Sequence, residues 1–258
     1  MPEAGISPNV TLWMFDFDGT LSPLVTDRKA ARLDSACCDM LHQLAAVRGF
    51  YCAVLSSRQL ADLESRVDVP GIFLGGGSGL EWKLPDGRRQ VPEADRMDAI
   101  RKIRKTLIPE IMEWGRLPGV EIEDKQWSVA IHFRRATQQV QHELATLLGL
   151  WQQARKVRAF RGPAVVEIQL LPQVDKSFGV RAFCDLVSCT PAAGRLVYAG
   201  DDENDAVAMQ LVRGWGGTVV TVGEKAIVHG SDVVSSPMEL AERINILAGF
   251  GDNIKIEK

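Results

Sequence analysis

Short apolar runs alternate with segments of helical length near both ends of the chain, and this alternation constrains the fold more than any other feature. Runs with the length and composition of buried strands occur at residues 11–17, 50–55, 71–74, 195–199 and 218–222. Segments with helical spacing lie at residues 33–47, 59–67, 176–186, 205–212 and 238–247. The pattern predicts an α/β fold in which helices cover both faces of a parallel sheet.

The middle of the chain has a different pattern. Residues 95–114 place apolar side chains on one helical face, although Pro109 is expected to kink or end this helix. Residues 127–134 alternate apolar and polar side chains, which is the period of a half-buried strand. The other elements expected here are a turn between short strands at 83–89, a helix at 137–153 and a strand at 164–171.

These middle elements predict an antiparallel sheet backed by two helices. Because they interrupt the alternating pattern, we expect them to form an inserted α+β domain. The predicted division is a first core segment at residues 1–83, the insertion at 84–172 and a second core segment at 173–258.

The composition argues against several classes of function. The 258 residues carry a net charge of −3, with a pI near 5.9, which gives no basic surface for nucleic acid or an anionic membrane. The stretch MPEAGISPNV at residues 1–10 lacks the regions of a signal peptide, and no apolar run is long enough to span a bilayer. Five cysteines without a CxxC pair favour reduced thiols over disulfides or zinc. We expect a cytoplasmic protein that is a monomer or a weak dimer.

Two acidic residues follow the first predicted strand in the sequence WMFDFDGT. In an extended segment Asp16 and Asp18 point the same way, at the carboxyl end of the strand, where open α/β sheets bind ligands. Two carboxylates held together resist ionising unless a cation lies between them, and oxygen ligands suit Mg2+. Gly19 lets the backbone approach a ligand closely, and Thr20 adds a hydroxyl. The alternative is a solvated loop whose acids cap the next element.

A second group of acids follows the strand at residues 195–199. Asp201 comes directly after Gly200 and is best placed to complete a metal site, while Asp205 could orient metal-bound waters. Asp202 lies beside them. The alternative is a helix that carries acids in its first turn, as many helices do. Two acidic strand ends in one chain favour the metal site.

One hydroxyl and one lysine complete the pattern. Ser56 follows an apolar strand, where it could bind a phosphate oxygen or simply cap a helix. Lys176 starts a predicted helix, against the preference of the helix dipole. A lone lysine there would be a solvated surface residue, but beside crowded carboxylates it becomes the cation that offsets their charge.

The ordered set of DFDGT, Ser56, Lys176 and GDDEND resembles the four motifs of the haloacid dehalogenase superfamily of phosphotransferases. The stretches GGGSGLEW, EIEDKQWSVAIHFR, VVEIQ, DKS and YAGDDEND resemble, in order and spacing, the trehalose-6-phosphate phosphatases over nearly the whole chain. The resemblance implies a Rossmann-like core with the insertion as its cap, and a phosphatase that acts on trehalose-6-phosphate.

The resemblance also implies a mechanism. Asp16 would attack phosphorus and form an aspartyl-phosphate. Asp18, its acid form favoured by nearby negative charge, would act as general acid and then as general base. Mg2+ would be held by Asp16, the backbone carbonyl of Asp18 and Asp201, with Asp202 and Asp205 behind them. The expected phosphate-binding residues are Gly19, Thr20, Ser56, Ser57 and Lys176.

For the sugar, the resemblance points to the insertion. Glu123, Lys125 and Glu167 match positions that contact the disaccharide in the family, and Arg58 and Gly79 are expected to join them. Judged by the residues alone, the segment 123–125 is more typical of a solvated turn. His132 could lie at the site or at the surface.

The chain departs from the family pattern at two motifs. Ser78 stands where the family commonly has histidine, and Asn204 and Ala206 change the last motif. Two alternatives therefore stay open. One is a phosphatase of another sugar phosphate, such as sucrose, glucosylglycerol or mannosylglycerate phosphate, and the other is a non-catalytic binding protein of the same fold.

Overall fold

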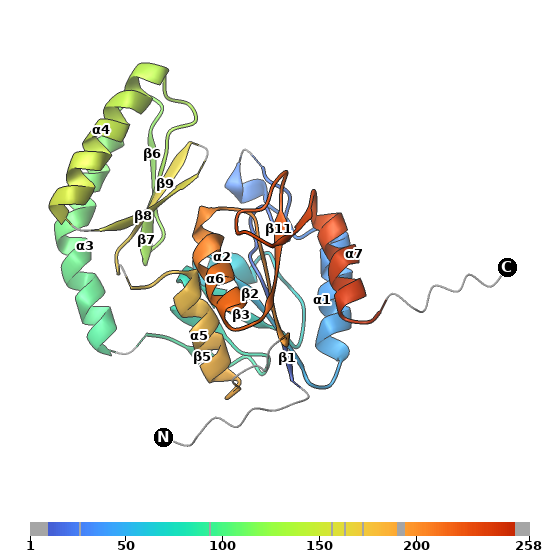
Figure 1. The fold of residues 1–258 in the computed structure, drawn as a ribbon. Coiled ribbons are helices and arrows are strands. Elements are labelled where there is room, and N and C mark those ends of the chain that lie inside the picture. The colour runs from blue at the N-terminus through green and yellow to red at the C-terminus, as the bar shows by residue number, and fades with distance from the viewer. Residues whose placement is uncertain are drawn as a thin grey trace.

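The computed structural model describes residues 10–25, 27–92, 94–155, 157–162, 164–171, 173–189 and 194–250. Within them, two sheets lie side by side, each with its own helices (Figure 1). The large sheet has the order β12-β11-β10-β1-β2-β3-β4-β5 and the small sheet the order β6-β7-β9-β8.

The large sheet is parallel from β12 to β3, and β4 and β5 extend it as an antiparallel edge. Its strands alternate with helices along the chain, and this connection favours parallel pairing. The strands are β1 (Thr11–Phe15), β2 (Phe50–Leu55), β3 (Phe73–Gly76), β4 (Glu81–Lys83), β5 (Arg89–Gln90), β10 (Leu196–Gly200), β11 (Thr218–Val222) and β12 (Asp232–Val234).

Helices cover both faces of the large sheet, as the alternating pattern predicted (Figure 1). One face packs against α1 (Ser35–Ala46), α2 (Leu60–Glu64) and α7 (Pro237–Leu247). The other face packs against α5 (Lys176–Leu186) and α6 (Glu203–Gly214). Since the helices that follow β1 and β10 lie on opposite faces, a crevice opens between the ends of these neighbouring strands, where α/β sheets bind ligands.

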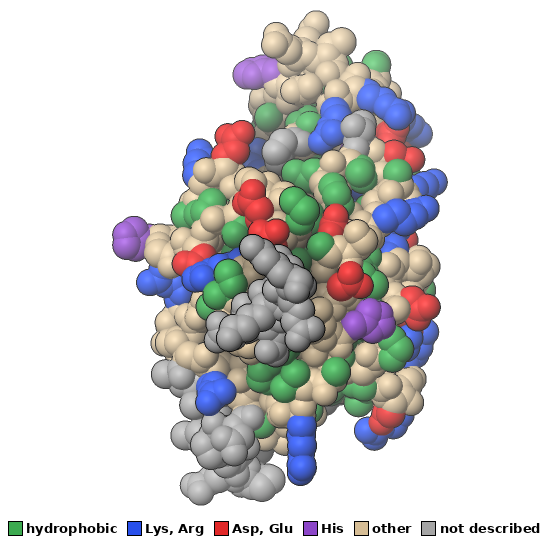
Figure 2. Space-filling model, turned by 90° about the vertical axis from the view of Figure 1, so that its right-hand side faces the viewer, with side chains coloured by type: hydrophobic (Ala, Val, Ile, Leu, Met, Phe, Trp, Pro, Cys, Tyr) green, Lys and Arg blue, Asp and Glu red, His purple; other side chains and the backbone are tan. Residues whose placement is uncertain are grey.

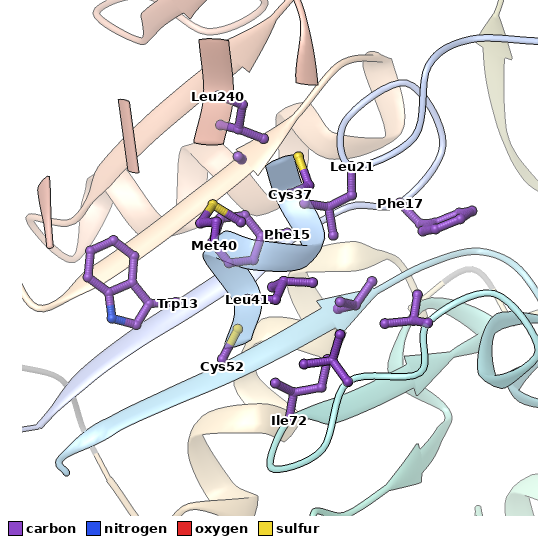
Figure 3. Packing of buried hydrophobic residues seen from close by; sticks show 14 of the residues in the cluster. Trp13, Phe15, Phe17, Leu21, Cys37, Met40, Leu41, Cys52, Ile72 and Leu240 are labelled. Atoms are coloured by element: carbon purple, nitrogen blue, oxygen red, sulfur yellow. The ribbon is translucent and has the colours of Figure 1, made fainter. Parts of the chain in front are cut away.

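The strand period sorts the core residues between the two faces. Trp13 and Phe15 point toward α1, where Figure 3 shows them with Met40, while Leu12 and Met14 point toward α5 and α6. Each fully buried side chain of this kind contributes about 1.5–3 kcal/mol. Burial on both faces explains why β1 is apolar from Leu12 to Phe15.

The small sheet is antiparallel and carries two long helices on its outer side (Figure 1). We call the elements from α3 to β9 the insertion. They are α3 (Ala94–Trp114), β6 (Glu121–Asp124), β7 (Ser128–His132), α4 (Gln138–Arg155), β8 (Arg158–Gly162) and β9 (Val165–Gln169). Among the described residues, no helix is long and apolar enough to cross a membrane.

Two features of the middle of the chain bear on the expected elements. Pro109 lies inside α3 and does not end it. The apolar face continues on both sides of the proline: Leu107 before it and Ile111 after it pack on the small sheet. This packing outweighs the lost backbone hydrogen bond. In addition, β5 pairs with β4 at the edge of the large sheet, so that sheet extends beyond residue 84.

The other element bounds agree with expectation or shift by a few residues. The strands at 50–55 and 218–222 and the helix at 176–186 match β2, β11 and α5. The short strands β6, β8 and β12 were not predicted, because they carry too many polar residues to show a clear period. Residues 1–9 and 172, on which the signal-peptide expectation and one domain boundary depend, lie outside the described residues.

A small apolar cluster joins the two sheets. Leu80 and Val174 from the large-sheet side pack with Trp127 and Ile100 of the insertion. Gly77 makes room for the indole, because a Cβ on this residue would lie 2.2 Å from Trp127 Cδ1. The cluster lies where the chain passes between the sheets.

Candidate active site

The ends of β1 and β10 bring two aspartates together. The backbone N–H of Asp16 donates to Ala199 O over 2.9 Å, and this bond extends the β1–β10 pairing past the last strand residue. Gly19 has a φ of +84°, and a Cβ on it would lie 2.1 Å from Asp201 Oδ2. Only glycine fits this close approach, so the loop after β1 lies against the acid that follows β10.

Lys176 occupies the centre of the site. Its Nζ donates to Asp16 Oδ1 and to Asp205 Oδ1, each over 2.6 Å, and its side chain is 2% exposed. The side chain of Asp175 caps α5 by accepting the backbone N–H groups of Ser177 and Phe178. The lysine at the helix start is therefore a buried cation between two carboxylates, as its position beside the acidic motifs indicated.

Both carboxylate oxygens of Asp205 accept hydrogen bonds. Its Oδ1 also accepts from the Tyr198 hydroxyl over 2.7 Å, and its Oδ2 accepts from the backbone N–H groups of Asp201 and Asp202 over 3.2 and 3.4 Å. Asp202 completes a capping box at the start of α6. Asp205 thus holds both the lysine and the loop that presents Asp201.

Three carboxylates could share a cation. Asp16, Asp201 and Asp205 each offer an oxygen, and these oxygens lie within 4.8 Å of one another. Burial raises the pKa of Asp16 and of Asp201, and the charges of neighbouring aspartates add to the rise, while Lys176 opposes it. Crowded oxygen ligands that resist ionising together fit a hard divalent cation. The Asp18 carboxylate lies outside this cluster.

Asp18 instead pairs with two arginines. Arg58 Nε and Nη2 donate to its two oxygens, each over 2.7 Å, and Arg28 Nη2 lies 3.7 Å from Oδ2. Burial raises the pKa of Asp18, but these arginines and Lys125 outweigh burial and hold it below its usual value. The expectation that nearby negative charge favours the acid form is therefore wrong for this arrangement.

The hydroxyls expected at the phosphate site lie around the same crevice. Ser56 follows β2, and its backbone N–H donates to Gly75 O over 2.9 Å. Its hydroxyl oxygen accepts the backbone N–H of Arg58 over 3.2 Å. Thr20 donates to Asp201 Oδ1 over 3.4 Å. Gly79 has a packing reason for being glycine, because a Cβ there would lie 2.4 Å from the Gly179 Cα.

The insertion contributes a buried charge pair. Lys125 Nζ donates to Glu167 Oε2 over 2.7 Å and to the Ser57 hydroxyl over 3.1 Å, and Ser128 donates to Glu167 Oε1 over 2.7 Å. The Lys125 side chain is 4% exposed, so a solvated turn is wrong for this residue. Because Ser57 belongs to the large-sheet side, Lys125 connects the two parts of the molecule.

Further contacts join the insertion to the crevice between β1 and β10. Glu123 Oε2 accepts from Arg28 Nη1 over 2.5 Å and lies 2.9 Å from His132 Nε2, so His132 faces the site. On the opposite side, Arg158 of β8 pairs with Asp175, the N-cap of α5. Among the described residues, Arg28, Arg158 and Tyr198 are contacts that the sequence analysis did not predict.

With this geometry in place, comparison with known proteins identifies the family. The sequence model for trehalose-phosphatase matches residues 14–233. This chain belongs to the trehalose-phosphatase family. It is 33% identical over 242 residues to the trehalose-phosphate phosphatase of Mycobacterium tuberculosis (strain ATCC 25618 / H37Rv), which covers 91% of this chain. The match covers 60% of that relative's length.

Solved structures agree on the fold. The C-terminal domain of the C. albicans trehalose-6-phosphate phosphatase superposes with a TM-score of 0.72 at 20% identity, covering 94% of this chain and 93% of that chain. A haloacid dehalogenase-like hydrolase from Bacteroides thetaiotaomicron superposes with a TM-score of 0.61 at 16% identity, covering 91% and 99%. The fold is that of the haloacid dehalogenase-like hydrolases, as the motif resemblance implied.

The family motifs account for much of the site, and the two departures have structural settings. Ser78 adopts a φ of 58° inside the 3-10 helix η2 (Gly77–Gly79), which a non-glycine residue seldom does. Asn204 donates to Asp202 Oδ2 over 3.0 Å, and its own Oδ1 is buried without a partner. An acceptor in this state can bind a water or a ligand donor.

Proposed function

We propose that this chain is a Mg2+-dependent phosphatase that converts trehalose-6-phosphate into trehalose and phosphate. The observation that carries the proposal is the buried Asp16 carboxylate at the end of β1, bonded to Lys176 and facing Asp201. Family membership supports the substrate, because the M. tuberculosis relative is a trehalose-phosphate phosphatase. Five free cysteines suit the reducing cytoplasm as the place of action.

In the first step, an Asp16 oxygen attacks phosphorus and the bond from phosphorus to the sugar oxygen breaks. Asp18 donates a proton to the departing oxygen, so that trehalose leaves as the neutral alcohol. Lys176 and Ser56 hold oxygens of the transferring group, and Lys176 fixes the nucleophile as well. The product of this step is an aspartyl-phosphate on Asp16.

In the second step, a water attacks the phosphorus of this intermediate. Asp18 accepts a proton from the water, the bond from phosphorus to the Asp16 oxygen breaks, and phosphate leaves. Asp205 keeps Lys176 and the loop of Asp201 in place through both steps. Asp16 and Asp201, with the backbone carbonyl of Asp18, would hold Mg2+, which neutralises phosphoryl charge when bound.

The acid step requires a change at Asp18. Arg58 engages both of its oxygens and lowers its pKa, which favours the ionised form. Exchanging one of these bonds for a contact with the substrate would return the pKa toward its usual value. We infer that substrate binding rearranges the pair of Asp18 and Arg58.

The insertion supplies the sugar contacts in this proposal. Glu123, Lys125 and Glu167 offer acceptors and donors that suit a polyhydroxylated ligand. Lys125 Nζ lies 3.1 Å from the Ser57 hydroxyl, and this contact brings the sugar residues beside the phosphate residues. We infer that the insertion acts as a cap that closes to exclude water, about connections after residue 90, rather than near residues 82–84 in β4, and near residues 171–174. The large sheet extends to Gln90, so the first cap boundary moves from 84 to after 90.

The substrate is tested by phosphate release from a panel of sugar phosphates in the presence of Mg2+. The panel contains the 6-phosphates of trehalose and sucrose and the phosphates of glucosylglycerol and mannosylglycerate. We expect trehalose-6-phosphate to give the highest kcat/KM. A higher value for another member would refute the substrate, and no Mg2+-dependent turnover of any member would favour a non-catalytic protein.

The nucleophile is tested by Asp16→Asn. The change removes the nucleophilic charge at nearly constant volume, so turnover should be lost while the fold stays intact. Asp39→Asn on the exposed side of α1 is the matched control and should retain full activity. Parental rates in Asp16→Asn would refute the role of Asp16.

A further inference from the structure

Arg28 lies between the two halves of the site. It belongs to the 3-10 helix η1 (Arg28–Ala30), in the loop between β1 and α1. Its Nη1 donates to Glu123 Oε2 in the insertion over 2.5 Å, and its Nη2 lies 3.7 Å from Asp18 Oδ2. One guanidinium therefore contacts the proposed general acid and a proposed sugar ligand.

The loop that carries Arg28 is held firmly. Arg58 Nη2 donates to the backbone carbonyl of Arg28 over 2.9 Å, and Arg66 Nη1 donates to that of Ala31 over 2.8 Å. Asp62 on α2 accepts from both arginines. The Arg58 and Arg66 side chains are almost fully buried, and their hydrogen bonds hold the backbone at η1 in place. Arg28 thus has a defined anchor.

The contact with Glu123 is too exposed to be a major source of stability. The side chains of Arg28 and Glu123 are 27% and 41% exposed, and solvent weakens such pairs. Glu123 Oε2 also accepts from His132, so the insertion has a second partner for this carboxylate. Arg28 therefore matters for its position between Glu123 and Asp18 rather than for the stability that it adds.

We propose that Arg28 is a specificity-determining residue that couples the position of the insertion to Asp18. The inference rests on the proposed function, since it takes Glu123 as a sugar ligand and Asp18 as the general acid. A disaccharide phosphate spans both parts and meets Arg28 between them. A small phosphate ester occupies the phosphoryl end alone and does not need the link to Glu123.

The test is a double-mutant cycle on two substrates. We would measure kcat and KM for trehalose-6-phosphate and for p-nitrophenyl phosphate with the wild type, Arg28→Gln, Glu123→Gln and the double variant. Arg28→Gln should lower kcat/KM for trehalose-6-phosphate about tenfold, as expected for one charged hydrogen bond, and change that for p-nitrophenyl phosphate less than about twofold. The double variant should have a kcat/KM for trehalose-6-phosphate no lower than that of the less active single variant, because both substitutions remove the same contact.

Lys29→Gln is the matched control, since it removes a neighbouring charge from the exposed side of η1 and should leave both substrates unaffected. Three results would overturn the role of Arg28 without affecting the proposed function. They are equal losses of kcat/KM on the two substrates, losses that multiply in the double variant, and no loss in Arg28→Gln. Failure of the wild type to hydrolyse trehalose-6-phosphate, with p-nitrophenyl phosphate still cleaved, would overturn the proposed function and this inference together. Equal thermal midpoints would show that the fold is unchanged.

Discussion

Replacing Lys176 with methionine would test the charge balance of the site. Methionine is similar in length and apolar, so Lys176→Met removes the ammonium and leaves the packing of the stem largely intact. Asp16 and Asp205 would each lose a hydrogen bond of 2.6 Å while remaining at most 5% exposed. Two carboxylates would then face each other without a cation.

Removing one partner of a buried ion pair costs about 3–5 kcal/mol. We expect the lower end, about 3 kcal/mol at neutral pH, because the already raised pKa of Asp16 allows its carboxyl to take a proton. For a chain of this size, this corresponds to a fall in the unfolding midpoint of roughly 6–12 °C. Turnover should fall about 100-fold or more, because a donor to the transferring group is lost.

The measurement is urea unfolding followed by circular dichroism, once with EDTA and once with Mg2+. Mg2+ should raise the free energy of unfolding more in Lys176→Met than in the parent, because the ion replaces the missing cation. Lys225→Met, at an exposed position, is the control and should match the parent. A free energy of unfolding within about 1 kcal/mol of the parent with EDTA would refute the reasoning, since it would mean that the carboxylates do not need Lys176.

Two further predictions concern Ser78 and Arg58. Ser78→Gly should raise the free energy of unfolding by about 0.5–1 kcal/mol, because glycine adopts a φ of 58° without steric cost; a lower value in urea titrations would contradict the strain at this position. Arg58→Gln should raise the pKa of Asp18, so that its acid form persists to higher pH. In the pH profile of kcat, the limb that requires protonated Asp18 should therefore move to higher pH. An unmoved limb would show that Arg58 does not control the pKa of Asp18.

The strand ends of the site could be predicted from the sequence because their position depends on topology. An apolar run followed by an acid places that acid at the carboxyl end of a parallel strand, and this reasoning brought Asp16 and Asp201 to one crevice. Lys176 was predicted for a different reason: a cation at a helix start opposes the helix dipole, and beside acidic motifs it indicates a nearby anion.

The partners of Asp18 could not be predicted in this way. Arg28 comes from a short charged turn that is typical of a solvated loop, and its contact with Glu123 spans 95 residues of sequence. Burial raises the pKa of Asp18, but Arg58 and Arg28 lower it further, and because both lie outside the local motif, that motif alone gave the wrong direction. The small polar strands β6 and β8 were missed because their pairing in the small sheet outweighs their weak strand pattern.

The surface charge does not indicate a strongly charged binding partner. On the face shown in Figure 2, basic and acidic side chains are interspersed, in keeping with a net charge of −3. The charges that matter lie in the crevice, where burial strengthens their interactions.

The pairing of Arg158 with Asp175 has a consequence for exchanging parts between relatives. Asp175 caps the helix whose first residue is Lys176, so the insertion touches the support of that lysine as well as the sugar side. A chimera that carries the insertion of a related protein would alter the anchoring of Lys176 unless position 158 remained arginine. Under the proposed function, this contact links substrate range to catalytic rate, and we expect a graft designed to change one to change the other as well.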